Sequence, residues 1–220
     1  MDFIRQIIDF ILHVDVYLSD IIAQYGAWTL AFLFVIIFIE TGVVVMPFLP
    51  GDSLIFAAGT FAARGALNPW ALFVVLSLAA ILGDTVNYWI GHRVGGKAYS
   101  GEVKWVKKDH LERTHAFFEK YGGKAIFLAR FVPIVRTFAP FVAGVSQMPY
   151  GFFIRWNVIG AIVWVGIFTA LGYFFGNIPF VQENFELVIV AIVVISVIPA
   201  VVEALKARKE FRQPKVEAEA

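Results

Sequence analysis

The sequence predicts an all-α polytopic membrane protein. Its expected architecture is an inverted repeat with two opposed re-entrant helix-turn-helix segments, transmembrane helices and an N-terminal amphipathic helix. Of its 220 residues, 60% are hydrophobic and 16% are charged, which is too apolar for a soluble domain of this size. Residues 21–39, 65–83 and 156–182 contain no Asp, Glu, Lys or Arg. Since about 20 apolar residues span a bilayer as a helix, several spans fit.

Residues 2–24 are expected to form the amphipathic helix, because polar residues recur mostly three or four positions apart. Its polar face is acidic, which anionic lipids would repel. A position in the membrane interface and packing against another part of the protein therefore both stay open. A hydrophobic helix is expected to follow, from about residue 26 to residue 39.

Further apolar helices are expected at about 69–92, 152–175 and 187–204. The polar stretch 92–124 between the first two holds eight Lys/Arg against four Asp/Glu, and together with the residues after 202 it contains most of the Lys and Arg of the chain. The positive-inside rule therefore places a connector at 93–124 and the C-terminus in the cytoplasm.

The turn at 176–186 has no Lys or Arg and is expected on the outer side. These assignments divide the chain into a single membrane domain, 1–205, and a cytoplasmic tail, 206–220.

Two segments, about 40–63 and 125–147, mix charges, prolines and glycines with apolar residues. In the first, Pro47-x-x-Pro50 precedes an Ala-Ala-Gly triplet, and in the second, Pro133-x-x-Arg136 precedes Val-Ala-Gly at a similar spacing. With the topology above, one segment enters from outside and the other from the cytoplasm, as in transporters with a midplane site. The predicted structural breaks are Pro47, Pro50, Gly51, Pro133, Pro140 and Gly144.

Arg130 and Arg136 are the first candidate site residues, because a charged side chain at the bilayer centre costs about 2.5–3.5 kcal/mol even on lenient scales. A break at Pro133 would let both side chains turn into one cavity. A guanidinium matches a phosphate bidentately and stays charged, so the pair is interpreted as a clamp for a lipid phosphate. Two arginines that snorkel to the cytoplasmic edge are the alternative.

Glu40 and Asp52 are the candidate proton-coupling residues. A carboxylate in a low-dielectric environment binds a proton more readily, and a nearby arginine opposes this. We expect these acids to pair with the arginines when the site is empty and to take up a proton when phosphate displaces them. The alternatives are an Asp52 helix cap and an interfacial Glu40.

Asp84 and Asn87 are secondary candidates, since they share one face of the 69–92 helix with Ser77 and Gly91. A helix–helix hydrogen bond is an equally good interpretation of Asp84. Gly172 and Gly176 form a small-xxx-small pair suited to close helix packing.

No enzyme, cofactor or metal site is expected. The chain has no cysteine, and its four histidines lie in the N-terminal segment and the polar connector, with no H-E-x-x-H motif. The expected partners are phosphate-bearing membrane lipids and protons, with no nucleic acid, and homo-oligomerisation stays open. A proton-dependent ion or drug antiporter and a non-transporting scaffold are the competing functions.

Four motifs give the sequence a family resemblance: "ETGVVVMPFLPGDSLIFAAG" at 40–59, "GDTVNYWIG" at 83–91, "NVIGAIVWV" at 157–165, and "KYGGKAIFLARFVPIVRTFAPFVAG" at 120–144. They closely resemble the DedA family of bacterial inner-membrane proteins, whose wider group shares a VTT domain with eukaryotic lipid scramblases.

The resemblance implies a flippase or scramblase for undecaprenyl phosphate or a phospholipid such as phosphatidylethanolamine, dependent on the proton motive force and supporting envelope homeostasis. The family's membrane-embedded acids and arginines correspond to Glu40, Asp52, Arg130 and Arg136.

Overall fold

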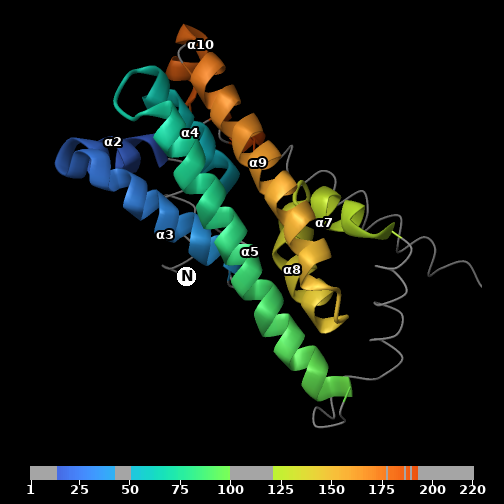
Figure 1. The fold of residues 1–220 in the computed structure, drawn as a ribbon. Coiled ribbons are helices and arrows are strands. Elements are labelled where there is room, and N and C mark those ends of the chain that lie inside the picture. The colour runs from blue at the N-terminus through green and yellow to red at the C-terminus, as the bar shows by residue number, and fades with distance from the viewer. Residues whose placement is uncertain are drawn as a thin grey trace, which may run out of the picture.

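The computed structural model of the protein describes residues 14–42, 51–99, 121–176, 178–185, 187–188 and 190–192, and their regular structure is entirely helical (Figure 1). The first four elements are α2 (Val14–Tyr25), the short 3₁₀ helix η1 (Gly26–Trp28), α3 (Thr29–Gly42) and α4 (Gly51–Ala63). The others are α5 (Pro69–Tyr99), α7 (Gly123–Ala129), α8 (Pro133–Val145), α9 (Tyr150–Phe175) and α10 (Pro179–Glu183).

The two long helices, α5 and α9, run in opposite directions and form the centre of the molecule (Figure 1). The short helix α4 packs on the C-terminal half of α9, and α8 packs on the C-terminal half of α5. Each short helix therefore contacts the long helix that belongs to the other half of the chain. The two-fold relation between the halves and their re-entrant paths through the membrane stay predictions.

Glycines allow close approach of the backbones at both crossings. A Cβ atom on Gly172 would overlap the carbonyl oxygen of Phe56 in α4, and one on Gly144 would overlap that of Tyr88 in α5. Gly59 and Gly144, which end the two similar sequence triplets, thus both lie where a short helix crosses a long one. The packing interpretation of Gly172 is confirmed.

Replacing Gly172 by leucine is expected to destabilise the protein by about 1–3 kcal/mol or more, because the new side chain would collide with the backbone of α4. Thermal unfolding of the purified protein in detergent measures the effect. Gly96→Ala is the matched control, since a Cβ atom there meets nothing within 4 Å. Equal melting temperatures for the two variants would contradict the close α4–α9 packing.

The distribution of side chains is typical of a membrane protein. Large apolar residues are exposed along the long helices, for example Val74 and Leu78 on α5 and Ile159 and Ile162 on α9, whereas several charged groups are buried. Within the described ranges, three segments are long and apolar enough to cross a membrane: Val16–Gly42, Pro69–Lys97 and Tyr150–Phe175. The prediction of a helical membrane protein is confirmed.

The N-terminal part of the first of these segments packs on the protein. Leu18 of α2 is buried in the same apolar cluster as Leu33 of α3 and Leu54 of α4. Between α2 and α3 the chain bends at Gly26, whose φ of +54° lies in the left-handed region that favours glycine. The hydrophobic helix therefore begins at Thr29 rather than at residue 26, and it ends at Gly42 rather than at residue 39.

Helix α5 is longer than the sequence predicted. Asn68 precedes its first residue, and the Asn68 side-chain oxygen accepts hydrogen bonds from the backbone N–H groups of Trp70 and Ala71, both at 3.0 Å. The helix continues to Tyr99 instead of ending near residue 92, so residues 93–99 are helical and not part of an irregular connector. The helix persists because Gly95 lets α5 stay packed against the end of α8.

Helix α8 corrects two of the predicted breaks. The chain does break before Pro133: Val132 is extended, as expected for a residue that precedes proline, and Pro133 begins α8. Pro140, however, lies inside the helix, and Gly144 lies near its end, so neither interrupts it. The backbone tolerates Pro140 by losing one helical hydrogen bond.

The remaining predictions fall outside the described residues in whole or in part. Pro47 and Pro50 lie outside them, as do the tail at 206–220, the N-terminal residues 1–13 and most of the connector. Of the helix expected at 187–204, residues 187–188 and 190–192 are described and are helical.

Candidate anion-binding site

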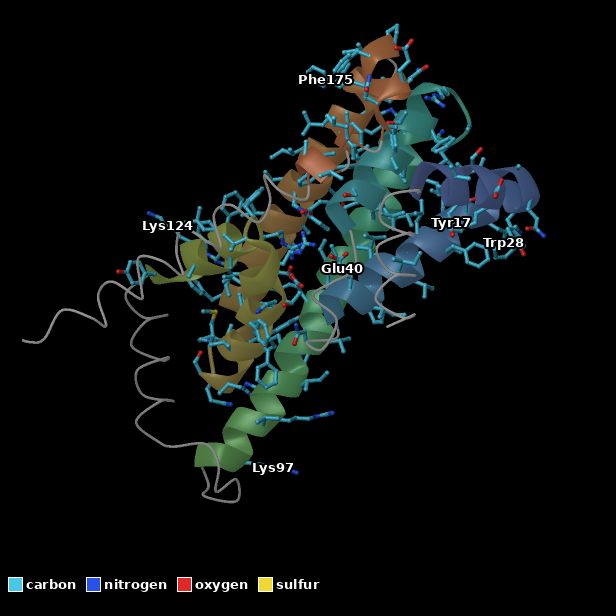
Figure 2. The ribbon with its side chains drawn as sticks, turned by 180° about the vertical axis from the view of Figure 1, so that it is seen from behind. Tyr17, Trp28, Glu40, Lys97, Lys124 and Phe175 are labelled. Carbon is cyan, nitrogen blue, oxygen red and sulfur yellow. The ribbon has the colours of Figure 1, made fainter. Side chains whose placement is uncertain are left out.

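The candidate site lies where segments from both halves of the chain meet near the centre of the molecule, around Glu40 (Figure 2). Glu40 belongs to the last turn of α3, Asp52 to the first turn of α4 and Asp84 to the middle of α5. Arg130 follows α7 at the break, and Arg136 lies in the first turn of α8. We call these five side chains the buried ionic network.

Arg136 bridges two carboxylates from different helices. Its Nη1 donates to Asp52 Oδ1 at 2.5 Å, and its Nη2 donates to Glu40 Oε1. The Arg136 side chain is 9% exposed and that of Glu40 is 1% exposed. Asp52 also lies at the N-terminus of α4, where the helix dipole favours a negative charge. Asp52 Oδ1 also accepts a hydrogen bond from Trp164 Nε1, so this side chain contacts α8 and α9 as well as its own helix.

Arg130 has different partners. Its Nη2 donates to Asp84 Oδ2 and, at 2.6 Å, to Asn157 Oδ1 in α9. Asn157 in turn donates from Nδ2 to the carbonyl oxygen of Ile81 at 3.1 Å, which fixes its orientation. Space for the arginine comes from Gly160, where a Cβ atom would lie 3.2 Å from Arg130 Nε. The expectation that Glu40 and Asp52 would pair with both arginines is therefore wrong for Arg130.

Both guanidinium groups lie inside the protein, so the snorkelling alternative is wrong. Arg130 is 4% exposed, and its charge is paired within the helix bundle. The break between α7 and α8 produces this arrangement because it removes the separation of roughly 120° that six residues of a continuous helix would impose. The chain brings Arg130 and Arg136 to one small cavity.

Trp164 is a site residue that the sequence did not indicate. Its Nε1 donates to Asp52 Oδ1 at 2.8 Å, and its ring lies 5.1 Å from the Arg136 guanidinium carbon and 5.8 Å from that of Arg130. The indole face thus stabilises both cations, and its N–H holds Asp52. The one available signal was its position, since Trp164 lies in the middle of its charge-free run and not near an end, where interfacial tryptophans occur.

Asn87 connects three helices beside the network. Its Nδ2 donates to the carbonyl oxygens of Thr41 in α3, at 3.2 Å, and of Thr137 in α8, at 2.7 Å. Among the described side chains it forms no hydrogen bond with either arginine, so its contribution is to hold the walls of the site together. The other members of its polar stripe, Ser77, Asp84 and Gly91, are also buried in the protein.

The cavity between the arginines is small. It offers about 10 Å³ to the centre of a water-sized sphere, room for about one water molecule. Its walls include Asp84, Arg130, Arg136 and Trp164. Since a phosphate group is several times larger than a water molecule, a lipid headgroup could enter only if the walls of this cavity moved apart.

The network contains one more carboxylate than guanidinium groups, so its net charge is −1 when every group is ionised. Among the described residues, Arg136 Nε has no hydrogen-bond partner although the atom is buried. An unpaired buried charge is costly, and one added proton would remove it. The described residues contain no group of three or more His, Cys, Asp or Glu arranged to hold a metal ion.

Gly51 leaves the space that Glu40 occupies. A Cβ atom at position 51 would overlap the Glu40 carboxylate, which cannot move away without leaving Arg136. We therefore expect Gly51→Ala to lower the stability by about 1–3 kcal/mol and to weaken function. Unfolding in detergent and complementation of a deletion strain measure the two effects. Gly151→Ala is the control, because a Cβ atom there meets nothing within 4 Å, and equal behaviour of the two variants would contradict the contact.

The fold and this site define a helical membrane protein with a buried network of acids and arginines. Comparison with known proteins gives the family. Residues 49–174 match the VTT domain family, a range that contains the whole network except Glu40. Protein DedA of Escherichia coli K12 is 53% identical over 212 residues, which cover 95% of this chain and 97% of the relative.

Two more distant relatives agree. An uncharacterized membrane protein of Mycobacterium tuberculosis H37Rv is 43% identical over 191 residues, covering 86% of this chain and 84% of the relative. The inner membrane protein YqjA of E. coli K12 is 36% identical over 148 residues, covering 67% of each chain. No solved structure matches. The chain belongs to the DedA family of VTT-domain membrane proteins, as its motifs indicated.

Proposed function

We propose that the protein translocates a phosphate-bearing lipid across the bacterial inner membrane, without covalent change to the lipid, and so supports envelope homeostasis. The substrate is undecaprenyl phosphate or a phospholipid such as phosphatidylethanolamine, and the C-terminus faces the cytoplasm. The observation that supports this most is the bridge from Arg136 to Glu40 and Asp52. Two nitrogens of one guanidinium already hold two anionic oxygens, and a phosphate offers the same pattern.

In this proposal the structure corresponds to the empty, closed state. The carboxylates occupy the place of the ligand, and the cavity has room for about one water molecule. Loading requires a phosphate to replace Asp52 and Glu40 at Arg136. The lipid tails stay in the bilayer while the headgroup crosses through the site.

Proton coupling follows from the same exchange. A carboxylate that loses Arg136 stays buried between α3, α4 and α9 without a counter-charge, and protonation removes that cost. A proton is therefore taken up when phosphate binds and is released when it leaves. Since low pH favours protonation, loading is expected to be faster on the acidic side of the membrane.

The test is reconstitution of the purified protein in liposomes with labelled phosphatidylethanolamine, phosphatidylglycerol or undecaprenyl phosphate, with and without a pH gradient. We expect faster movement of at least one lipid than in protein-free liposomes, without a covalent product, and a further acceleration from the acidic side. Dye or cation fluxes without lipid movement would instead indicate an antiporter.

The acids provide the test of coupling. Glu40→Gln and Asp52→Asn are expected to remove the effect of the pH gradient, because neither amide can take up a proton. If both variants kept the wild-type rate and its pH dependence, proton coupling through these residues would be wrong.

A further inference from the structure

We propose that only Arg136 exchanges its anionic partners, whereas Arg130 stays neutralised by Asp84. The site then accepts a single negative charge and favours a phosphodiester over a doubly charged phosphomonoester. Of the two substrates proposed above, it therefore prefers the phospholipid, which is a diester, to undecaprenyl phosphate, which is a monoester. This inference rests on the proposed function and specifies the charge class of its ligand. It follows from the different surroundings of the two arginines.

Arg130 is held by neighbours that are themselves fixed. Its Nη2 contacts Asp84 in α5 and Asn157 in α9, and Asn157 is tied to the carbonyl oxygen of Ile81. The side chain passes Gly160 closely enough that a Cβ atom there would lie 3.2 Å from Nε. Moving Arg130 would thus break contacts to both long helices, which pack against each other at the centre of the fold.

Arg136 is incompletely satisfied. Its partners lie at the end of α3 and the start of α4. Within the described part of the chain, its Nε–H is buried without an acceptor. An incompletely satisfied pair loses less on exchange, and a phosphate oxygen could accept the free N–H.

The charges around Arg136 determine how many negative charges on a ligand the site can neutralise. In the described structure, Glu40 faces it from α3, Asp52 from α4 and Asp84 from α5, while Arg130 lies at the break before α8. Helix α9 contributes the neutral side chains of Asn157 and Trp164. Arg130 and Asp84 cancel, and protonation neutralises the displaced acids. One positive charge, that of Arg136, is then left for the ligand.

A single charge discriminates between two classes of phosphate. A phosphodiester carries one negative charge throughout the neutral pH range. A phosphomonoester carries about −1.5 to −2 at pH 7, because its second pKa is about 6. The additional negative charge would be buried without a partner, which is costly. The preference should therefore disappear at low pH, where the monoester also carries one charge.

The test uses the purified full-length protein in detergent and isothermal titration calorimetry with two lipids of equal tail length. Dihexanoylphosphatidylglycerol is the diester, and dihexanoyl phosphatidate is the monoester. We expect the diester to bind about tenfold or more tightly than the monoester at about pH 8, with a ratio near one at about pH 5. Titration of the protein's own acids changes the affinity for both lipids, so the ratio of the two dissociation constants removes this effect.

Asp84→Asn supplies the matched variant. It frees the charge of Arg130, so the preference at high pH should shift toward the monoester, whereas Glu40→Gln, which leaves the Asp84–Arg130 pair intact, should keep the wild-type ratio. Should Asp84→Asn fail to fold, the wild-type ratios at the two pH values still decide the question. A ratio that stays near one at high pH would overturn the inference.

Two further arms separate this inference from the proposed function. If neither lipid bound, the proposed function would be overturned and the inference with it. Inorganic phosphate and glycerol 3-phosphate are the tail-free probes. If they bound as tightly as phosphatidate with the same pH dependence, the charge rule would hold but the ligand would be free phosphate rather than a lipid.

Discussion

Replacing Arg136 by lysine is expected to slow lipid transport by about 10- to 100-fold while the protein remains folded. Lysine keeps the charge, but it cannot hold two acceptors in the fixed geometry of a guanidinium. The loss corresponds to one hydrogen bond to a charged group, about 1.5–3 kcal/mol. The measurement is the initial rate of headgroup translocation in proteoliposomes that contain equal amounts of folded protein.

Arg155→Lys is the matched control, because Arg155 is an exposed residue of α9 and lies outside the buried ionic network. Its transport rate should equal that of the wild type. If Arg136→Lys also transported at the wild-type rate, bidentate phosphate binding at this position would be wrong.

Replacing Asp84 by asparagine is expected to have the largest effect on stability, about 3–5 kcal/mol. It leaves the buried Arg130 without its counter-charge, and loss of one partner from a buried ion pair typically costs this much. Arg136 beside it adds repulsion between like charges. Equilibrium unfolding of the detergent-solubilised protein gives the free-energy difference from the wild type.

The double variant Arg130→Gln with Asp84→Asn separates the charge effect from the shape effect. Because it removes both charges, it should be more stable than Asp84→Asn alone, with a coupling energy of at least about 1 kcal/mol. Additive losses in the double-mutant cycle would show that the two side chains do not interact as an ion pair.

The sequence predicted the class of protein and most members of the site, because both depend on local composition. Runs without charges indicate membrane helices wherever they occur, and Arg130 and Arg136 stand out because arginine is expensive in such a run. The break before Pro133 was also predictable, since proline constrains the residue before it.

The pairing of Glu40 and Asp52 with an arginine was predicted and is confirmed for Arg136. Which arginine each acid would contact, and the pairing of Arg130 with Asp84, were not predictable, because they depend on how distant helices meet. Arg136 contacts Asp52 and Glu40 across 84 and 96 positions of sequence, and Arg130 contacts Asp84 across 46. The position of Asp84 on a polar stripe therefore did not indicate that it is the counter-charge of Arg130.

Trp164 was missed for a related reason: an indole in an apolar helix is ordinarily assigned to lipid or core. Pro140 was misjudged because a helix packed against α5 can continue through a proline.

The central claim is that a lipid phosphate displaces Glu40 and Asp52 from Arg136 and that the freed acids are protonated. Infrared difference spectroscopy of the reconstituted protein, before and after addition of dihexanoylphosphatidylglycerol, tests this claim most directly. The account predicts that the C=O band of a protonated carboxylic acid increases on binding, and that the increase is lost in the Glu40→Gln/Asp52→Asn double variant. Lipid binding without any change in carboxyl protonation would contradict the account.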